Sequence, residues 1–317
     1  MDNTAKILVT GGAGFIGTHL MADLIDDGFT VIGVDNFNDN LYNPQLKYDR
    51  MTAFRHPVLN VDMKNFDRLD EVFQMFRPDV VIHLGARAGV RDSYGKERLY
   101  HADNIDATQN VIDICKMYDV KQVVYASTSC VYAGTYPLPW TEPHVHGHQL
   151  NAYGWTKRVN ESQFISSGLN NIGLRFFTVY GPWGRPDMAL FDFTKNILAG
   201  KEIEAYNYGD MKRDFTYIGD IIAGIKTVLF EHSNIDNNEI FNIGRGKQVE
   251  LMHFIDCISK ELGVDAKVKL APPHPADTQE TWASTKKLEA LGYKPKVNIE
   301  QGVQAFVQWY KNYYEVN

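Results

Sequence analysis

The segment Val9-Thr10-Gly11-Gly12-Ala13-Gly14-Phe15-Ile16-Gly17 stands between a short apolar run and a stretch of helical periodicity. Three glycines with GxxGxxG spacing at a strand-to-helix junction are typical of a dinucleotide-binding turn. Gly11 permits the tight turn, Gly14 lets the backbone approach a pyrophosphate, and Gly17 allows the helix to pack closely. Because the first N–H groups of such a helix face the phosphates, the segment predicts a nucleotide-binding βα unit at the start of the chain.

Two carboxylates follow the next expected strands. Asp35 lies eighteen residues after Gly17, at the end of the second strand, where a carboxylate accepts ribose hydroxyls and repels a 2′-phosphate. Its neighbour Asn36 is not basic, so the cofactor is expected to be NAD rather than NADP. Asp62 follows what looks like a third strand and either accepts from the adenine amino group or caps the next helix.

Apolar, β-branched runs alternate with helical stretches through the first half of the chain. The expected strands are Lys6–Thr10, Thr30–Val34, Asp79–Leu84, Gln122–Ser127 and Ile172–Phe177. The expected helices lie near Phe15–Asp27, Asp67–Phe76, Leu99–Tyr118 and Tyr153–Ser166. This alternation predicts an α/β fold, a doubly wound parallel sheet of the Rossmann type with right-handed crossovers.

The pattern changes after Tyr180, where Gly181-Pro182-Trp183-Gly184-Arg185-Pro186 forms a breaker cluster. We therefore expect residues 1–177 to form the NAD-binding domain and residues 178–317 to form a smaller, mixed α/β substrate-binding lobe. Strands of that lobe can interleave with the first domain.

Composition limits the classes of function. A net charge of -7 argues against a nucleic-acid partner, because neutralising phosphates requires a basic face. The three cysteines, Cys115, Cys130 and Cys257, are widely spaced and lack metal-site spacing, which favours buried thiols in a reducing compartment and no metal. No stretch approaches about 18 apolar residues, and residues 1–6 contain no apolar signal core, so we expect a cytoplasmic protein with no membrane partner.

Tyr153 and Lys157, in the run Asn-Ala-Tyr-Gly-Trp-Thr-Lys, supply the chemistry. Residues four apart share one helix face, where the ammonium is expected to lower the phenol pKa from about 10 towards neutrality. With a nicotinamide cofactor as hydride acceptor, the pair indicates oxidation of a secondary alcohol. His83, at the end of a buried strand, is expected to be a hydrogen-bonded core histidine.

These motifs together resemble the extended short-chain dehydrogenase/reductase family, in its NAD-dependent epimerase/dehydratase branch, and the likeness runs essentially end to end. The matching runs are the glycine loop, Asp35, residues 83–91 (HLGARAGVR), residues 127–132 (STSCVY) and the Tyr153–Lys157 pair. The sharpest match, residues 174–189 (LRFFTVYGPWGRPDMA), resembles the UDP-glucuronate 4-epimerases within that family. Residues 206–209 and 212–218 resemble the same subgroup.

The resemblance implies a role for each matching position. Tyr153 would be the base at the sugar O4, Lys157 would tune it, and Thr128 would bridge O4 and the tyrosine. The implied cofactor contacts are Gly11, Gly14, Phe15, Ile16, Gly17, Asp35, Asn36, Asp62, Met63, Leu84, Ala86, Asn104, Tyr153 and Lys157. The implied substrate contacts are Arg91, Ser129, Thr178, Arg185, Ala189, Tyr206, Asn207, Arg213 and Asp277.

Plainer roles stay open for three of these residues. Asn104 could cap a helix or face solvent, Arg213 could be a solvated arginine, and Arg185 could merely pair with Asp187.

The implied reaction is C4 epimerisation of a UDP-sugar, UDP-glucuronate to UDP-galacturonate, through a 4-keto intermediate in a homodimer. A UDP-glucose or UDP-N-acetylglucosamine 4-epimerase and a catalytically reduced, NAD-bound regulatory protein are the alternatives. The 4,6-dehydratases of the family carry an acidic pair after the catalytic threonine, where this chain has Ser129-Cys130. The decarboxylases carry a glutamate at the position of Cys130 and an arginine pair after the position of Asp277. Both activities are therefore disfavoured.

Three departures from the subgroup stand out. Cys130 replaces a hydroxyl in a run of serines. Arg87 and Asp92 stand where the subgroup more often has an uncharged residue and an aromatic. The segment Gln163–Asn171 is several residues shorter than usual, next to helices that pair in the family's dimers.

Overall fold

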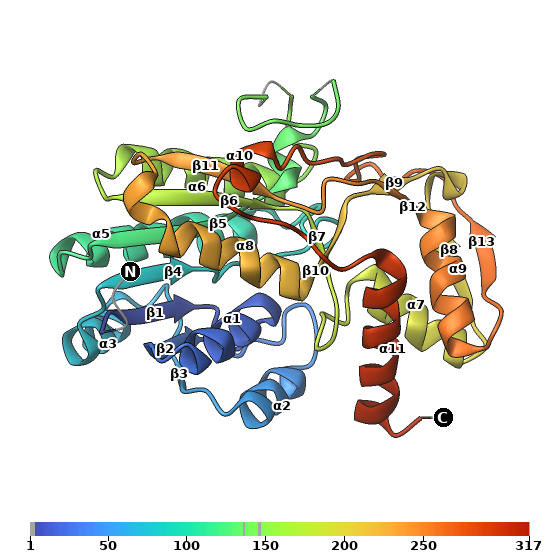
Figure 1. Ribbon diagram of the computed structural model, residues 1–317, viewed down its shortest axis with the longest axis horizontal. Helices are drawn as coiled ribbons and strands as arrows, with labels where there is room; N and C mark the ends of the chain where they lie inside the picture. The colour runs from blue at the N-terminus through green and yellow to red at the C-terminus, as the bar shows by residue number, and fades with distance from the viewer. Residues whose placement is uncertain (1–3, 136, 145–146, 317) are drawn as a thin grey trace.

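The fold is built on one parallel sheet, seen in a computed structural model that describes residues 4–135, 137–144 and 147–316 (Figure 1). The strand order is β11-β6-β5-β4-β1-β2-β3, and every pairing is parallel. Its strands are β1 (Lys6–Thr10), β2 (Thr30–Asp35), β3 (Val58–Asn60), β4 (Val80–His83), β5 (Gln122–Thr128), β6 (Asn171–Phe176) and β11 (Glu239–Ile243). The order reverses direction beside β1, which confirms the predicted doubly wound sheet.

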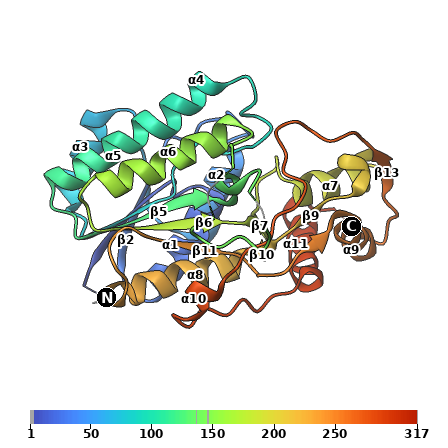
Figure 2. The ribbon, with the colours of Figure 1, turned by 90° about the horizontal axis from the view of Figure 1, so that it is seen from above.

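Helices cover both faces of this sheet (Figure 2). One face packs on α1 (Phe15–Asp26) and α8 (Ile218–Phe230), and the other packs on α3 (Phe66–Phe76), α5 (Ala107–Met117) and α6 (Ala152–Ser166). Side chains of β1 alternate between the two faces: Ile7 and Val9 contribute to the first core and Leu8 to the second. Burial on both faces explains why the strands read as continuous apolar runs.

The prediction of one continuous helix at Leu99–Tyr118 is wrong in one respect. The structure has α4 (Glu97–Tyr100), then a π-helical turn, η1 (His101–Asp106), and only then α5. In the π-helical turn Asn104 is buried, and its side chain bonds the backbone of the loop after β4. Helical periodicity alone does not register this local widening, which is common at functional sites.

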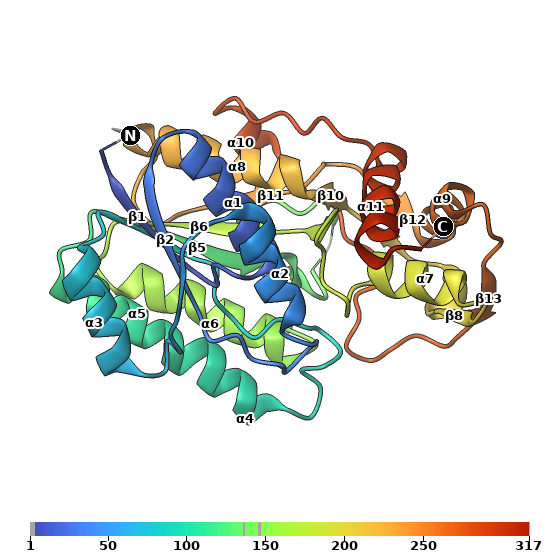
Figure 3. The ribbon, with the colours of Figure 1, turned by 90° about the horizontal axis from the view of Figure 1, so that it is seen from below.

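One helix of the structure, residues 45–54, was not among the predicted elements. Figure 3 shows α2 (Gln45–Phe54) beside α1, on the side of the second lobe. Its Arg50, fully buried, donates to the carbonyls of Ala13, Trp183 and Gly184. The helix has a weak apolar pattern and is fixed by this polar tie between the glycine loop and residues 183–184.

The second lobe has its own aromatic-rich core around α7 (Ala189–Leu198), α9 (Leu251–Leu262) and α11 (Ile299–Tyr314). Short strand pairs surround it: β7 (Thr178–Tyr180) with β10 (Phe215–Tyr217), β9 (Lys212–Arg213) with β12 (Val249–Glu250), and β8 (Glu202–Ala205) with β13 (Lys267–Leu270). The remaining short elements are η2 (Ser129–Tyr132), η3 (Asn207–Gly209), η4 (His232–Asn234) and α10 (Lys286–Glu289).

The two parts of the chain share elements. β11 pairs with β6 along its whole length, and α8 packs on the sheet, although both come from residues 178–317. The boundary between residues 177 and 178 stays a prediction, with these two elements crossing it. Within the described ranges, no helix combines the length and the apolar character that crossing a membrane requires.

Candidate active site

A cavity of about 340 Å³ opens at the carboxyl ends of the parallel strands. Its lining begins where β1, β2, β4 and β5 end, at Gly11, Asp35, Leu84 and Thr128. In doubly wound sheets this edge, beside the strand where the order reverses, is the ligand site. Most of the predicted site residues meet here, from segments far apart in the chain.

The glycine loop has the shape that a pyrophosphate needs. Gly11 has φ +71°, a conformation that favours glycine, and a Cβ on Gly17 would lie 2.2 Å from the carbonyl oxygen of Gly11. Gly14 is the N-cap of α1 and has no side chain, so the N-cap residue itself does not cap the first N–H groups of the helix. Phe15 and Ile16 of this first turn line the cavity. The loop therefore fits a dinucleotide, as the sequence predicted.

Asp35 is buried, and a lysine that the sequence analysis missed holds it in place. Its Oδ1 accepts from the backbone N–H of Phe37 at 2.9 Å and from Nζ of Lys47 at 3.0 Å. None of the hydrogen bonds among the described residues uses Oδ2, which is left for ribose hydroxyls. Lys47 lies on α2, the helix without a clear sequence signal, so no spacing rule could have paired it with Asp35.

We expect Lys47→Met to weaken NAD binding by roughly tenfold, because a charge-assisted hydrogen bond that orients Asp35 is lost. NADP binding should weaken more, since the unpaired carboxylate then repels a 2′-phosphate more strongly. Calorimetry on cofactor-free protein measures both affinities. Lys121→Met, which removes an exposed lysine paired with Asp79, is the control; equal affinities for wild type and Lys47→Met would contradict the assignment.

Asp62 does not cap the helix that follows it. The N-cap of α3 is Asn65, whose side chain accepts from the backbone N–H of Arg68. Asp62 instead accepts from the side chain of Asn36 at 3.1 Å and from the backbone of Lys64 at 2.9 Å. The capping alternative is therefore wrong, and Asp62, Asn36 and the neighbouring Met63 all line the cavity.

Asn104 supports the cavity without lining it. Its side chain accepts from the N–H of Arg87 at 2.7 Å and donates to the carbonyl of the same residue at 3.0 Å. It also donates to the hydroxyl of Thr156 on α6 at 2.9 Å. Asn104 is thus neither an N-cap nor solvent-exposed; it joins the loop after β4, which carries Leu84 and Ala86, to the helix that carries Tyr153.

The three predicted catalytic residues converge on the cavity. Thr128 ends β5, while Tyr153 and Lys157 come from the first two turns of α6. Asn151 caps that helix, accepting from the N–H of Gly154 at 2.8 Å. The cap and the helix fix where the phenol and the ammonium enter the cavity.

The prediction that the pKa of Tyr153 is lowered is wrong, because the structure raises it. Burial raises the pKa of Tyr153 to about 12, against the positive charge of Arg185 and a hydrogen bond from Thr128, both of which lower it. Burial also lowers the pKa of Lys157 to about 8, opposed by the charge of Glu161. Desolvation is the largest cause of both shifts, because a charged phenolate and a charged ammonium both lose hydration in this cavity.

A buried ion pair lies directly behind these residues. Glu161, one turn beyond Lys157 on α6, accepts from Arg175 of β6 at 2.7 and 2.9 Å. It also accepts from the hydroxyl of Ser127 at 2.6 Å and from Arg158 at 2.6 Å. Both partners of the pair are at most 2% exposed. The pair fastens α6 to the ends of β5 and β6, where Thr128 lies.

Of the predicted substrate residues, Ser129, Thr178 and Arg185 line the cavity. Arg185 forms an ion pair with Asp187, in which its Nε lies 3.0 Å from Oδ1, so the alternative that Arg185 pairs with Asp187 is confirmed beside its place in the cavity lining. Its side chain remains 20% exposed. The ion pair therefore fixes the guanidinium at the cavity wall.

Other predicted substrate residues form a neighbouring cluster. Arg91 lies 2.8 Å from a carboxylate oxygen of Asp277 and 4.0 Å from the ring centroid of Tyr206, so three distant segments meet. Arg213 donates to the carbonyl of Gln279 at 2.8 Å and is held there rather than free in solvent. None of these four lines the main cavity.

Two predicted residues lie elsewhere. Asn207 donates to the carbonyl of Asp210 at 2.6 Å and is outside the cavity lining. Ala189, the first residue of α7, lines a second, smaller cavity of about 30 Å³. Ala189 is adjacent to the site, because the two cavities share the lining residues Phe15, Thr178, Val179, Arg185 and Met188.

Comparison of the chain with known proteins identifies its family. The model described as "NAD dependent epimerase/dehydratase family" matches residues 7–244. The chain is 40% identical to Protein CapI of Staphylococcus aureus, covering 98% of this chain and 99% of that one. It is 38% identical to a UDP-glucuronate 4-epimerase of Thermodesulfobacterium geofontis, covering 98% and 97%.

A solved structure agrees. The UDP-glucuronic acid 4-epimerase from Bacillus cereus, in complex with UDP-glucuronic acid and NAD, superposes with a TM-score of 0.90 at 34% identity. The match covers 98% of this chain and 100% of that chain. The cofactor loop, the Thr128–Tyr153–Lys157 group and these full-length matches lead to one conclusion: the chain belongs to the NAD dependent epimerase/dehydratase family.

Proposed function

We propose that the protein is an NAD-dependent sugar-nucleotide 4-epimerase that converts UDP-glucuronate to UDP-galacturonate through a 4-keto intermediate. The observation that carries the proposal is the convergence of Thr128, Tyr153, Lys157 and Arg185 on the cavity of the glycine loop. A relative named UDP-glucuronate 4-epimerase and a solved structure named UDP-glucuronic acid 4-epimerase, each matched over at least 97% of its own chain, support the substrate.

The proposed chemistry uses one acid–base group in both directions. Tyr153 takes the proton of the O4 hydroxyl as tyrosinate, a form that burial disfavours and that the charges of Lys157 and Arg185 favour. The hydroxyl of Thr128 bridges the two oxygens. Bound NAD supplies reversible hydride acceptance at C4. The 4-keto sugar then rotates about its phosphate linkage and presents its other face. C4 takes its hydride back on that face while Tyr153 returns the proton to O4, so C4 is inverted and the cycle is redox-neutral.

Arg185 is the proposed partner of the sugar carboxylate. We expect Arg185→Ala to weaken UDP-glucuronate binding by about 10- to 100-fold, because a charge-assisted hydrogen bond to the acid is lost. Binding of UDP-glucose, which has no carboxylate, should change by less than about threefold. Calorimetry with both nucleotides on the NAD-loaded protein makes the comparison; equal losses for both would remove the carboxylate assignment.

The reaction itself is tested by incubating the purified protein, with and without added NAD, with UDP-glucuronate and separately with UDP-glucose. Proton NMR reports the configuration at C4. Selective conversion of UDP-glucuronate supports the proposal and shows that Cys130 is tolerated. Conversion of UDP-glucose alone would move the function to the neutral-sugar alternative.

We also propose that the enzyme is a cytoplasmic homodimer. Exposed apolar side chains on α4, α5 and α6 support a pairing face: Leu99, Met117, Trp155 and Ile165 are each at least 41% exposed. Sedimentation of the purified chain measures its oligomeric state, and a monomer at micromolar concentration would contradict the pairing.

A further inference from the structure

Four cationic side chains line the main cavity among the residues that the structure describes: Lys47, Arg87, Lys157 and Arg185. Three already have roles at other groups. Lys47 holds Asp35, Lys157 lies beside Tyr153, and Arg185 is at the substrate side. The diphosphate of a dinucleotide carries two negative charges, for which the cavity otherwise offers the glycine loop and the start of α1. Arg87 is the cation that remains.

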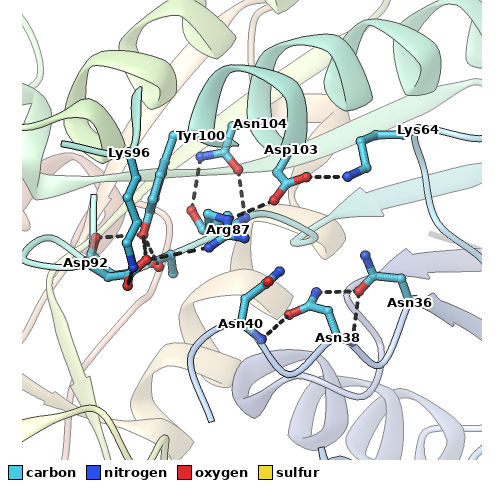
Figure 4. Close-up of polar contacts among 12 residues, drawn as sticks. Asn36, Asn38, Asn40, Lys64, Arg87, Asp92, Lys96, Tyr100, Asp103 and Asn104 are labelled. Carbon is cyan, nitrogen blue, oxygen red and sulfur yellow. Dashed lines mark hydrogen bonds and ion pairs between the residues drawn. The ribbon is translucent and has the colours of Figure 1, made fainter. Parts of the chain in front are cut away.

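The guanidinium of Arg87 is fixed within the cavity wall (Figure 4). Its side chain is 7% exposed, with Nε 2.8 Å from Asp103 and Nη1 3.6 Å from Asp92. It lies 5.5 Å from the ring centroid of Tyr100. No ion pair or hydrogen bond between described residues uses Nη2. The group is therefore held on two sides and retains donors for a ligand.

The surrounding charges leave the group cationic. Asp103 also pairs with Lys64 at 2.6 Å, and Asp92 also pairs with Lys96. The row Lys64–Asp103–Arg87–Asp92–Lys96 thus contains three cations and two carboxylates. Desolvating a guanidinium is costly unless it is paired, and this row supplies the pairing while keeping one excess positive charge.

The position also suits a phosphate. Arg87 follows Leu84 and Ala86 in the loop after β4, and its backbone is clamped by Asn104. In Figure 4 the loop after β2, with Asn36, Asn38 and Asn40, lies across from Arg87. Both loops line the same cavity as Phe15 and Ile16 at the start of α1. Arg87 thus shares one cavity with the helix N-terminus that faces a pyrophosphate.

We propose that Arg87 is a cofactor-binding residue whose guanidinium donates to the diphosphate of the dinucleotide, with Asp103 and Asp92 orienting it. The inference rests on the NAD site of the proposed function but not on the identity of the sugar. A charge-assisted bond to phosphate is among the stronger polar contacts in proteins, and arginine suits phosphate geometry.

The test measures binding to cofactor-free protein by calorimetry, with NAD, ADP-ribose and adenosine as ligands. Arg87→Gln should weaken NAD and ADP-ribose by about 10- to 100-fold and leave adenosine, which has no phosphate, unchanged. Arg87→Lys, which keeps the charge, should recover most of the affinity. The salt dependence of ADP-ribose binding should be less steep for Arg87→Gln. Arg68→Gln, at an exposed arginine of α3 paired with Glu71, is the matched control and should bind like the wild type.

Three outcomes would overturn the proposal. The first is unchanged ADP-ribose affinity in Arg87→Gln. The second is an equal loss for adenosine, which would show that the loop has collapsed. The third is an Arg87→Lys variant that binds ADP-ribose no better than Arg87→Gln, which would show that the positive charge does not bind the diphosphate. Because no epimerase assay is involved, an error in the proposed substrate cannot imitate any of these results.

Discussion

Tyr153→Phe is expected to lower turnover of UDP-glucuronate by about 10³- to 10⁴-fold, because the group that removes and returns the O4 proton is lost. The phenylalanine ring keeps the packing of α6, and Lys157 and Thr128 remain in the cavity. Affinity for NAD and for UDP-glucuronate should change by less than about threefold. Turnover measured by NMR at saturating substrate, together with calorimetry for both ligands, separates these effects.

The control for this variant is Tyr118→Phe, which removes the hydroxyl of a tyrosine that bonds Asp70 outside the cavity. It should turn over like the wild type. If Tyr153→Phe keeps more than about a tenth of wild-type turnover, another group is the base and the assignment fails.

Glu161→Ala is expected to destabilise the protein by about 3–5 kcal/mol, because removing one partner of a buried ion pair leaves the other charge uncompensated. Arg175 would keep its charge at 2% exposure, and Ser127 and Arg158 would each lose an acceptor. Urea unfolding of the cofactor-free protein measures the change. The loss should reach the active site too, since Glu161 ties α6 to the strand that ends at Thr128.

Two further variants check the reason for that loss. Glu161→Ala combined with Arg175→Met should be more stable than Glu161→Ala alone, because no buried charge is then left unpaired. Glu71→Ala, which breaks the exposed pair with Arg68, should cost less than about 1 kcal/mol. A cost below about 1 kcal/mol for Glu161→Ala would show that the pair is not what fastens α6.

Local features of the chain predicted the cofactor half of the site well. The glycine spacing, the carboxylate at Asp35 and the Tyr153–Lys157 pair are short-range patterns, and each depends on the geometry of one turn or one helix. The cavity contains all of them. The resemblance added Thr128, Thr178 and Arg185, which also line the cavity, whereas Arg91, Tyr206, Asp277 and Arg213 form a neighbouring cluster.

Such short-range patterns could not predict contacts between residues far apart in the chain. Lys47 reaches Asp35 from a helix with little apolar periodicity, and Asn104 supports the cavity from a π-helical turn. The buried Glu161–Arg175 pair joins a helix residue to a charged residue of an otherwise uncharged strand, and no local pattern links the two. The pKa of Tyr153 is raised, whereas the sequence analysis expected it to be lowered, because desolvation depends on the whole cavity and not on one helix neighbour.

The sequence by itself determined the parallel sheet, the dinucleotide loop and the placing of Tyr153 and Lys157, the proposed acid–base pair, on one helix, since period, glycine positions and helical spacing act over a few residues. The tertiary structure alone decided which charges meet. Arg87 pairs with Asp92 and Asp103, which are 5 and 16 residues away along the chain. Lys47 pairs with Asp35 across 12 residues, and Arg91 pairs with Asp277 across 186. Such pairings follow from how the loops at the strand ends fold over one another, because electrostatic partners are selected by distance in space and by burial.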